Sequence, residues 1–257
     1  MRPLTLYFHG LPGSAAELAS FGPEIAAQAG HFHVIARGDA LASGPGESYF
    51  ARLAAQISAQ FPDGALRLAG FSAGAAAALR VAPHLAARVQ QIDLISPAAP
   101  LQLGDFLGGM AGEPVFRAAL AGRVPFAALT FVQAQVTRLA PERMAAALMA
   151  KARGADRELA ADRDFLAGLA QSLRRSLIDQ RAAYAAEIRA YVTDWSGELA
   201  TVQQPVRIWQ GSEDDWTPPA MAQALAAHLP AEPSLRVMPG LSHFSALRAY
   251  LAALSPA

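Results

Sequence analysis

Residues 66–79 read Leu66-Arg-Leu-Ala-Gly-Phe-Ser72-Ala-Gly-Ala-Ala-Ala-Ala-Leu79. An apolar run typical of a buried strand passes through Gly-Phe-Ser-Ala-Gly into an alanine-rich run typical of a helix. A serine at such a strand-to-helix turn takes a strained backbone conformation, which pushes its hydroxyl out of the sheet edge. Gly70 and Gly74 lack a β-carbon and so allow the strand and the helix to approach closely. The stretch therefore predicts that Ser72 is a nucleophile.

The composition is typical of a folded protein with a sizeable core. The chain has 257 residues, of which 53% are hydrophobic, so it is long enough for one large α/β domain or for a domain with an insertion. Its net charge is zero, and its basic residues form no runs. This balance argues against nucleic acid and against anionic membranes as partners.

Several kinds of site are excluded by residue types that the chain lacks. Without cysteine it has no disulfide, no thiol nucleophile and no Cys-based metal site. It has no His-Glu-x-x-His, and its only lysine, Lys151, lies in no glycine-rich loop, so we expect neither a metal nor a cofactor. Leu4–Phe8 begins without a preceding signal-peptide pattern, and no apolar run approaches the roughly 20 residues of a membrane helix. We therefore expect a cytoplasmic protein without a spanning segment.

Strands alternate with helices on both sides of the Ser72 turn. We expect strands at Leu4–Phe8, His33–Arg37, Ala65–Phe71, Gln91–Ile95, Pro205–Gln210 and Ser234–Met238. We expect helices at Glu17–Ala29, Tyr49–Gln60, Ala73–Ala87, Pro219–His228 and Ser245–Leu254, and a loop at Gly38–Ser48. This alternation indicates right-handed crossovers and a parallel sheet that helices cover on both faces.

The alternation is interrupted between the fourth and fifth expected strands. Residues 101–196 contain no convincing buried strand and show only helical periodicity, as at Phe165, Leu169 and Leu173. Because strands resume afterwards, we expect a helical insertion into a single sheet. The predicted domains are residues 1–100 as the first part of the core, 101–196 as the insertion and 197–257 as the second part of the core.

Four candidate functional residues follow strands rather than precede them. Leu11 follows the first strand, Ser72 the third, Asp214 the fifth and His243 the sixth. Ligands bind at the carboxyl ends of the strands in an open parallel sheet, so these residues are expected at one edge. The order Ser, Asp, His along the chain is the order of the triad in α/β-hydrolases.

Four motifs around these residues resemble the α/β-hydrolase superfamily, specifically its cap-bearing serine members. His9-Gly-Leu-Pro-Gly13 is similar to the oxyanion loop and Gly70-Phe-Ser-Ala-Gly74 to the nucleophile elbow. Gly211-Ser-Glu-Asp-Asp-Trp-Thr-Pro218 is similar to the acid turn and Gly240-Leu-Ser-His-Phe244 to the histidine loop. The resemblance implies a mostly parallel sheet and makes the insertion a helical cap. The two antiparallel strands with which the family usually begins have no room before Leu4, so we expect about six strands.

The resemblance and the chemistry assign a role to each site residue. Ser72 is a weak nucleophile at neutral pH, so His243 must take its proton, and Asp214 must hold the imidazole. The backbone N–H groups of Leu11 and Ala73 are assigned to the oxyanion.

Three other acids compete with Asp214 for its role. Asp215 and Glu213 are its neighbours in the acid turn, and Asp105, after the fourth strand, is a minor alternative. Asp214 is also a candidate N-cap of the following helix.

The predicted substrate contacts are aromatic residues in or beside the motifs, namely Phe71, Trp216 and Phe244. Among the aromatic residues of the insertion, Phe106, Phe116, Phe126, Phe131 and Trp195, we expect most in the core and only one or two at the site. His9 is expected to support the oxyanion loop.

These observations predict a serine hydrolase that cleaves an ester-like bond of a small, partly apolar molecule through an acyl-enzyme. The same triad also supports acyl transfer, carbon–carbon bond hydrolysis or a cofactor-free lyase step, because a fold does not determine its reaction. A module that only binds a small apolar ligand is the alternative from another class of protein. Substrate identity and oligomeric state stay open.

Overall fold

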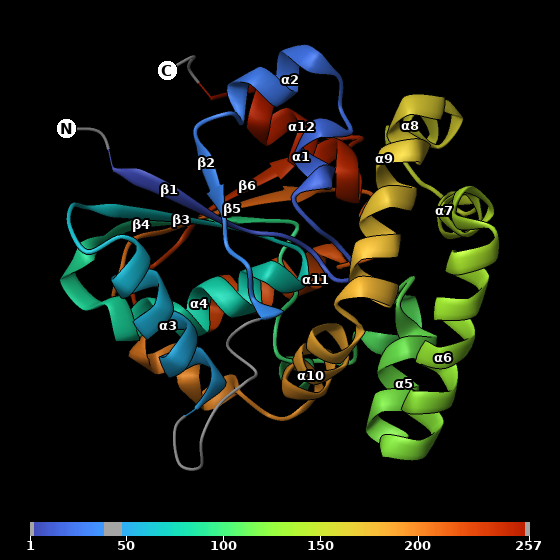
Figure 1. Ribbon diagram of the computed structural model, residues 1–257. Coiled ribbons are helices and arrows are strands. Elements are labelled where there is room, and N and C mark those ends of the chain that lie inside the picture. The colour runs from blue at the N-terminus through green and yellow to red at the C-terminus, as the bar shows by residue number, and fades with distance from the viewer. Residues whose placement is uncertain (1–2, 39–47, 255–257) are drawn as a thin grey trace.

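The centre of the molecule is a parallel sheet (Figure 1). The computed structural model describes residues 3–38 and 48–254. In these residues the sheet has six strands in the order β2-β1-β3-β4-β5-β6, and every neighbouring pair is parallel. The strands are β1 (Leu4–Phe8), β2 (Phe32–Val34), β3 (Leu66–Phe71), β4 (Val89–Ile95), β5 (Val206–Gly211) and β6 (Ser234–Met238). The predicted sheet of about six mostly parallel strands is confirmed.

Helices cover both faces of this sheet (Figure 1). On one face lie α1 (Ala16–Ala19), α2 (Pro23–Gln28) and α12 (His243–Ala252), and on the other α3 (Tyr49–Gln60), α4 (Ala73–Leu85) and α11 (Pro219–His228). Helix α3 shows why such segments are helical. Ser48 caps it by accepting a hydrogen bond from Ala51 N, and Phe50, Leu53 and Ile57 recur on its buried side.

Every described element between β4 and β5 is helical. Short turns lead into α5 (Glu113–Ala121), α6 (Arg123–Leu139), α7 (Pro141–Met149), α8 (Asp156–Ala161), α9 (Arg163–Arg174) and α10 (Arg181–Val192). These helices lie beside the sheet (Figure 1), and we call residues 101–196 the cap. Buried residues of the cap and of the sheet belong to one continuous hydrophobic core, so the boundaries at 101 and 196 stay predictions.

The predicted helix at Glu17–Ala29 is wrong in one respect, because the structure divides it into α1 and α2. Between them Gly22 takes a φ of +90°, which ends one helix, and Pro23 begins the next. Proline is tolerated at the first helical position because an N–H there would have no acceptor within the helix, so the missing N–H of proline costs nothing. The signal was present in the sequence as Gly-Pro inside an apolar periodic run.

Other boundaries differ by a few residues. The second strand runs over Phe32–Val34 instead of His33–Arg37, and α12 begins at His243 instead of Ser245. Residues 39–47 of the expected loop lie outside the described residues. The earlier start of α12 matters for the site because it places His243 in the first turn of a helix.

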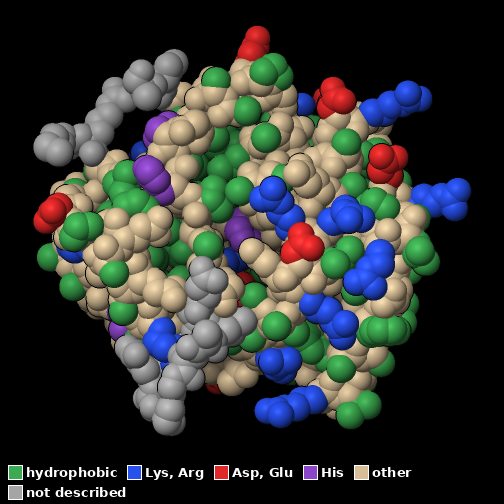
Figure 2. All heavy atoms as spheres, in the orientation of Figure 1, with side chains coloured by type: hydrophobic (Ala, Val, Ile, Leu, Met, Phe, Trp, Pro, Cys, Tyr) green, Lys and Arg blue, Asp and Glu red, His purple; other side chains and the backbone are tan. Residues whose placement is uncertain are grey.

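The cap carries exposed basic and apolar side chains. Figure 2 shows basic side chains gathered on the side of the molecule where the cap lies. Large apolar side chains are exposed along the outer side of α5 and α6, namely Leu120, Val124, Phe131, Val132, Val136 and Leu139.

Among the described residues, no helix combines the length and the apolar character that a bilayer span requires.

Candidate active site

Ser72 lies at the turn between β3 and α4 in a strained conformation. Its φ of 55° and ψ of −127° are values that residues with a β-carbon rarely adopt. Glycine is needed on both sides of it. A β-carbon on Gly74 would lie 2.1 Å from the carbonyl oxygen of Phe8, and one on Gly70 would lie 2.6 Å from Ala75 Cα. The turn therefore depends on close packing of strand against helix, as the sequence predicts.

Leu11 and Ala73 are the residues expected to supply the oxyanion amides. Both residues line the same cavity as Ser72, Leu11 from the loop after β1 and Ala73 as the first residue of α4. Within the described residues, neither N–H donates a hydrogen bond to a protein acceptor. Two unpaired donors at the N-terminus of a helix and in a neighbouring loop are suited to bind a developing negative charge.

Two buried residues, Glu17 and Arg37, form hydrogen bonds with the loop after β1, which resembles the oxyanion loop. Glu17 Oε1 accepts hydrogen bonds from Gly10 N at 3.2 Å and from Tyr7 OH at 2.7 Å. Burial raises the pKa of Glu17 to about 7, although these bonds and Arg37 oppose the rise. Burial, and to a lesser extent the charge of Arg37, lowers the pKa of His9 to about 3, so the ring is neutral at physiological pH. Arg37 also donates to His9 O at 2.8 Å, which ties the start of the loop to the core.

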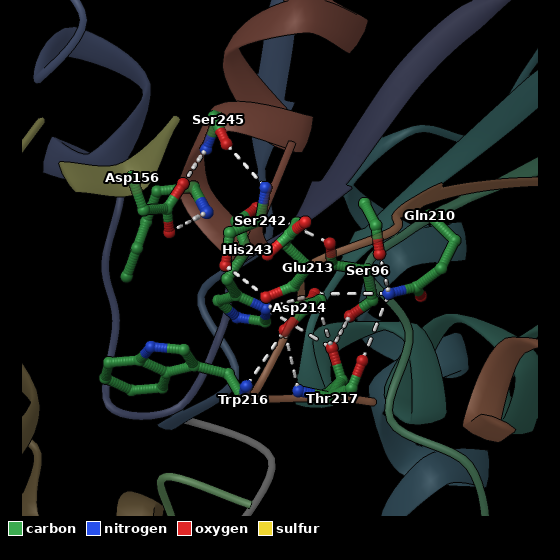
Figure 3. Close-up of polar contacts among 12 residues, drawn as sticks. Ser96, Asp156, Gln210, Glu213, Asp214, Trp216, Thr217, Ser242, His243 and Ser245 are labelled. Carbon is green, nitrogen blue, oxygen red and sulfur yellow. Dashed lines mark hydrogen bonds and ion pairs between the residues drawn. The ribbon is translucent and has the colours of Figure 1, made fainter. Parts of the chain in front are cut away.

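Asp214 is the carboxylate that reaches the histidine (Figure 3). Its Oδ2 lies 3.0 Å from His243 Nδ1, and its Oδ1 accepts from the backbone amides of Trp216 and Thr217 at 2.9 Å each. Burial alone would raise the pKa of Asp214, but His243 and the surrounding hydrogen bonds bring it below its ordinary value. The side chain is therefore an ionised acceptor in a buried turn.

The other candidate acids lie elsewhere. Asp215 faces Arg153, with Oδ2 3.4 Å from Nε, and Glu213 is exposed. Asp105 is exposed as well. Among the described residues, only Asp214 forms a hydrogen bond with the His243 ring through a carboxylate. Asp214 does not cap the following helix, because α11 begins at Pro219 with Pro218 as its N-cap. Its Oδ1 accepts instead from two amides of its own turn, which leaves Oδ2 for the histidine.

The His243 ring is held between aromatic neighbours. Trp216 stacks on it with ring centroids 5.4 Å apart at 12°, and the Phe71 ring lies 4.6 Å away. Nδ1 faces Asp214 and the Thr217 hydroxyl, so Nε2 is the nitrogen left for proton transfer. Within the described residues no hydrogen bond joins Nε2 to Ser72 Oγ. Such bonds are often long before a substrate binds.

Only one of the three predicted substrate contacts lines the cavity. Trp216 does, whereas Phe71 and Phe244 are buried beside the His243 ring and are absent from the cavity wall. Of the cap aromatics considered, Phe116 lines the cavity.

Two further residues at the site were not anticipated. They are Gln133 in the cavity wall and Asp156 on α8, which binds the first turn of α12. Nothing local in the sequence marks either of them, because both come from cap helices far along the chain from the site motifs. Among the described residues, no cluster of three or more His, Asp or Glu side chains is arranged to hold a metal ion.

No protein-family model matches the chain, and no curated protein matches it. Solved structures do match. They include a bromoperoxidase from Bacillus anthracis, 13% identical, with 97% of this chain and 88% of that chain covered and a TM-score of 0.63. An esterase from Thermogutta terrifontis is 18% identical, with 99% and 91% covered and a TM-score of 0.61. An α/β-hydrolase fold protein from Nakamurella multipartita is 18% identical, with 98% and 91% covered and a TM-score of 0.59. The chain has the α/β-hydrolase fold.

Proposed function

We propose that the protein is a serine hydrolase that cleaves an ester-like bond of a small, partly apolar substrate through an acyl-enzyme. The observation that carries this proposal is the buried Asp214–His243 hydrogen bond of 3.0 Å next to a serine on a strained turn. The shared fold with an esterase is consistent with it. Each group of the site has a defined step in such a reaction.

In the first step Ser72 Oγ attacks the carbonyl carbon while His243 Nε2 takes the hydroxyl proton. Asp214 accepts the Nδ1–H bond, which holds the tautomer and stabilises the imidazolium. The amides of Leu11 and Ala73 bind the oxyanion, and losing one such donor typically costs about 3 to 4 kcal/mol. The proton passes to the leaving alcohol. Water activated by the same ring then attacks the acyl-enzyme, and the acid is released.

The cavity beside Ser72 limits the acyl group. It has a volume of about 170 Å³, and most of its wall is apolar. A cavity of about 150 Å³ lined by aliphatic and aromatic side chains holds one benzene ring, so an acyl group of a few carbons or one ring fits here. The cap supplies much of the wall through Met110, Val115, Phe116, Met144, Leu148, Leu177 and Ile188.

Two polar side chains of the cap, Gln133 and Tyr184, line this apolar space. Gln133 lines the cavity, and its Oε1 is buried without a hydrogen-bond partner among the described residues. A buried polar atom without a partner costs about 1 to 3 kcal/mol, and a substrate group that bonds to it removes this cost. We therefore favour an acyl group that carries a hydroxyl or amide rather than a plain hydrocarbon.

The central test compares Ser72→Ala with Ser58→Ala, a matched change on α3 away from the site. On a short activated ester such as p-nitrophenyl butyrate, we expect Ser72→Ala to lower kcat by about 10⁴-fold or more and Ser58→Ala to have no effect. Unchanged circular dichroism confirms folding of both. Full activity in folded Ser72→Ala protein would exclude the proposal.

Two measurements separate the alternatives. A fluorophosphonate probe should label wild-type protein at Ser72, whereas ligand-induced stabilisation without labelling would favour a binding module. Chromatographic identification of a free acid and an alcohol as the only products would distinguish hydrolysis from acyl transfer, carbon–carbon cleavage or a lyase step.

A further inference from the structure

A carboxylate of the cap binds the first turn of the helix that begins with His243. Asp156, the first residue of α8, is 1% exposed. Its Oδ2 accepts from Phe244 N at 3.0 Å and its Oδ1 from Ser245 N at 2.7 Å, as Figure 3 shows. The first amides of a helix have no partner within the helix. At α12 two of them are therefore satisfied from a different part of the fold.

The chain before Asp156 touches the same loop. Ala155 N donates to Gly240 O at 2.9 Å. Gly154 approaches this loop so closely that a β-carbon on it would lie 2.4 Å from Gly240 O. The hydrogen bond of Ala155 and the close approach of Gly154 both involve the backbone of Gly240. Residues 154–156 of the cap and 240–245 of the histidine loop therefore pack as one unit.

We propose that Asp156 is a positioning residue for His243, through which the cap holds the proton-transferring ring in place. This inference rests on the proposed function. The backbone of His243 leads directly into the two amides that Asp156 binds, so their direction sets where the imidazole lies relative to Asp214 and Ser72. A misplacement of about 1 Å in such a group costs roughly 10²-fold in rate.

The charge of Asp156 adds to this geometric effect. The titratable groups that act on the His243 ring are Asp214 and Asp215 in the turn after β5, Glu17 on α1 and Asp156 on α8. A negative charge near the ring stabilises the imidazolium that forms when Ser72 loses its proton, so Asp156 also supports proton transfer electrostatically.

The experiment compares Asp156→Asn and Asp156→Ala with Asp162→Ala. Asp162 is a matched control because it caps α9 in the same way, with Oδ1 accepting from Asp164 N and Phe165 N at 2.8 and 3.2 Å, and among the described residues it bonds to no amide of the histidine loop. Activity is measured on p-nitrophenyl butyrate. The position of the His243 ring is followed by the NMR chemical shifts of ¹³C-labelled histidine in the Ser72→Ala background, which needs no turnover.

We expect kcat to fall about tenfold in Asp156→Asn and about 100-fold in Asp156→Ala, with KM within about threefold of wild type. The NMR shifts of the His243 ring should change in both variants, because the ring moves relative to Trp216 and Phe71, while Asp162→Ala matches wild type in kcat and in these shifts. Wild-type kcat and wild-type His243 ring shifts in folded Asp156→Asn would overturn the inference, as would equal losses in Asp156→Ala and Asp162→Ala. If Asp156→Ala fails to fold, Asp156→Asn decides. If Ser72→Ala keeps its activity, the proposed function fails, and the His243 ring shifts still decide whether Asp156 positions the ring.

Discussion

Replacing Glu17 by Gln tests the electrostatics behind the oxyanion loop. The Glu17 side chain is buried, and its Oε1 accepts from Gly10 N and Tyr7 OH. Glutamine keeps a carbonyl oxygen for these two donors and removes only the ability to ionise. The substitution therefore isolates the effect of a buried charge from the effect of the contacts.

The direction of the effect follows from the pKa of Glu17, which burial raises from an ordinary value of 4.5 to about 7. Between these values the folded protein keeps a proton that the unfolded chain has lost, so the free energy of unfolding falls as pH rises. Below pH 4.5 there is no penalty, and above pH 7 the penalty is complete. At about 1.36 kcal/mol per pKa unit, the complete penalty is about 3 kcal/mol.

Urea unfolding at pH 5 and pH 8, followed by circular dichroism, measures this difference. Relative to Glu17→Gln, the wild type should lose about 2 to 3 kcal/mol of unfolding free energy between the two pH values. Because the comparison is between two variants, titration of other groups cancels. The matched control is Glu24→Gln, since Glu24 is exposed on α2. A pH-independent difference between wild type and Glu17→Gln would refute the reasoning.

Three further predictions follow from other parts of the site. Asp214→Asn should lower kcat on p-nitrophenyl butyrate by about 10⁴-fold, whereas Asp215→Asn should stay within about threefold; the reverse ranking would move the catalytic role to Asp215. Gly74→Ala should lose about 3 kcal/mol or more of stability in urea, or fail to fold, because its β-carbon meets backbone 2.1 Å away. Gly197→Ala enters open space and serves as its control, so equal losses in both would contradict the packing argument. Gln133→Leu should reduce the preference for hydroxyacyl over plain acyl esters of equal length about tenfold in kcat/KM, and an unchanged preference would exclude a role in specificity.

Local patterns predicted much of the fold because they act within a few residues. The apolar run before Ser72, the glycines around it and the alanine-rich helix after it each restrict the backbone directly. The same holds for the parallel sheet, since strands that alternate with helices have few arrangements open to them. The wrong prediction of one helix over α1 and α2 also concerns local patterns. Gly22-Pro23 is a local signal for a helix break, but the prediction followed the apolar periodicity that continues across it.

Side-chain directions could not be predicted in this way. Phe71 and Phe244 are neighbours of site residues in the sequence, yet both pack beside the His243 ring and outside the cavity wall. Consecutive residues in a strand or turn point in different directions, so closeness in sequence does not place a side chain in a pocket.

Local patterns in the chain account for the strand-turn-helix at Ser72, for the order of the strands and helices and for the small set of residues at the carboxyl ends of the strands. Long-range packing selects which of three adjacent acids meets His243 and which cap residues enclose the cavity, and it brings Asp156 to the start of α12. These two groups of features differ in the range of the interactions that cause them. A backbone conformation depends on neighbours along the chain, whereas a contact between residues 88 positions apart depends on how whole layers pack.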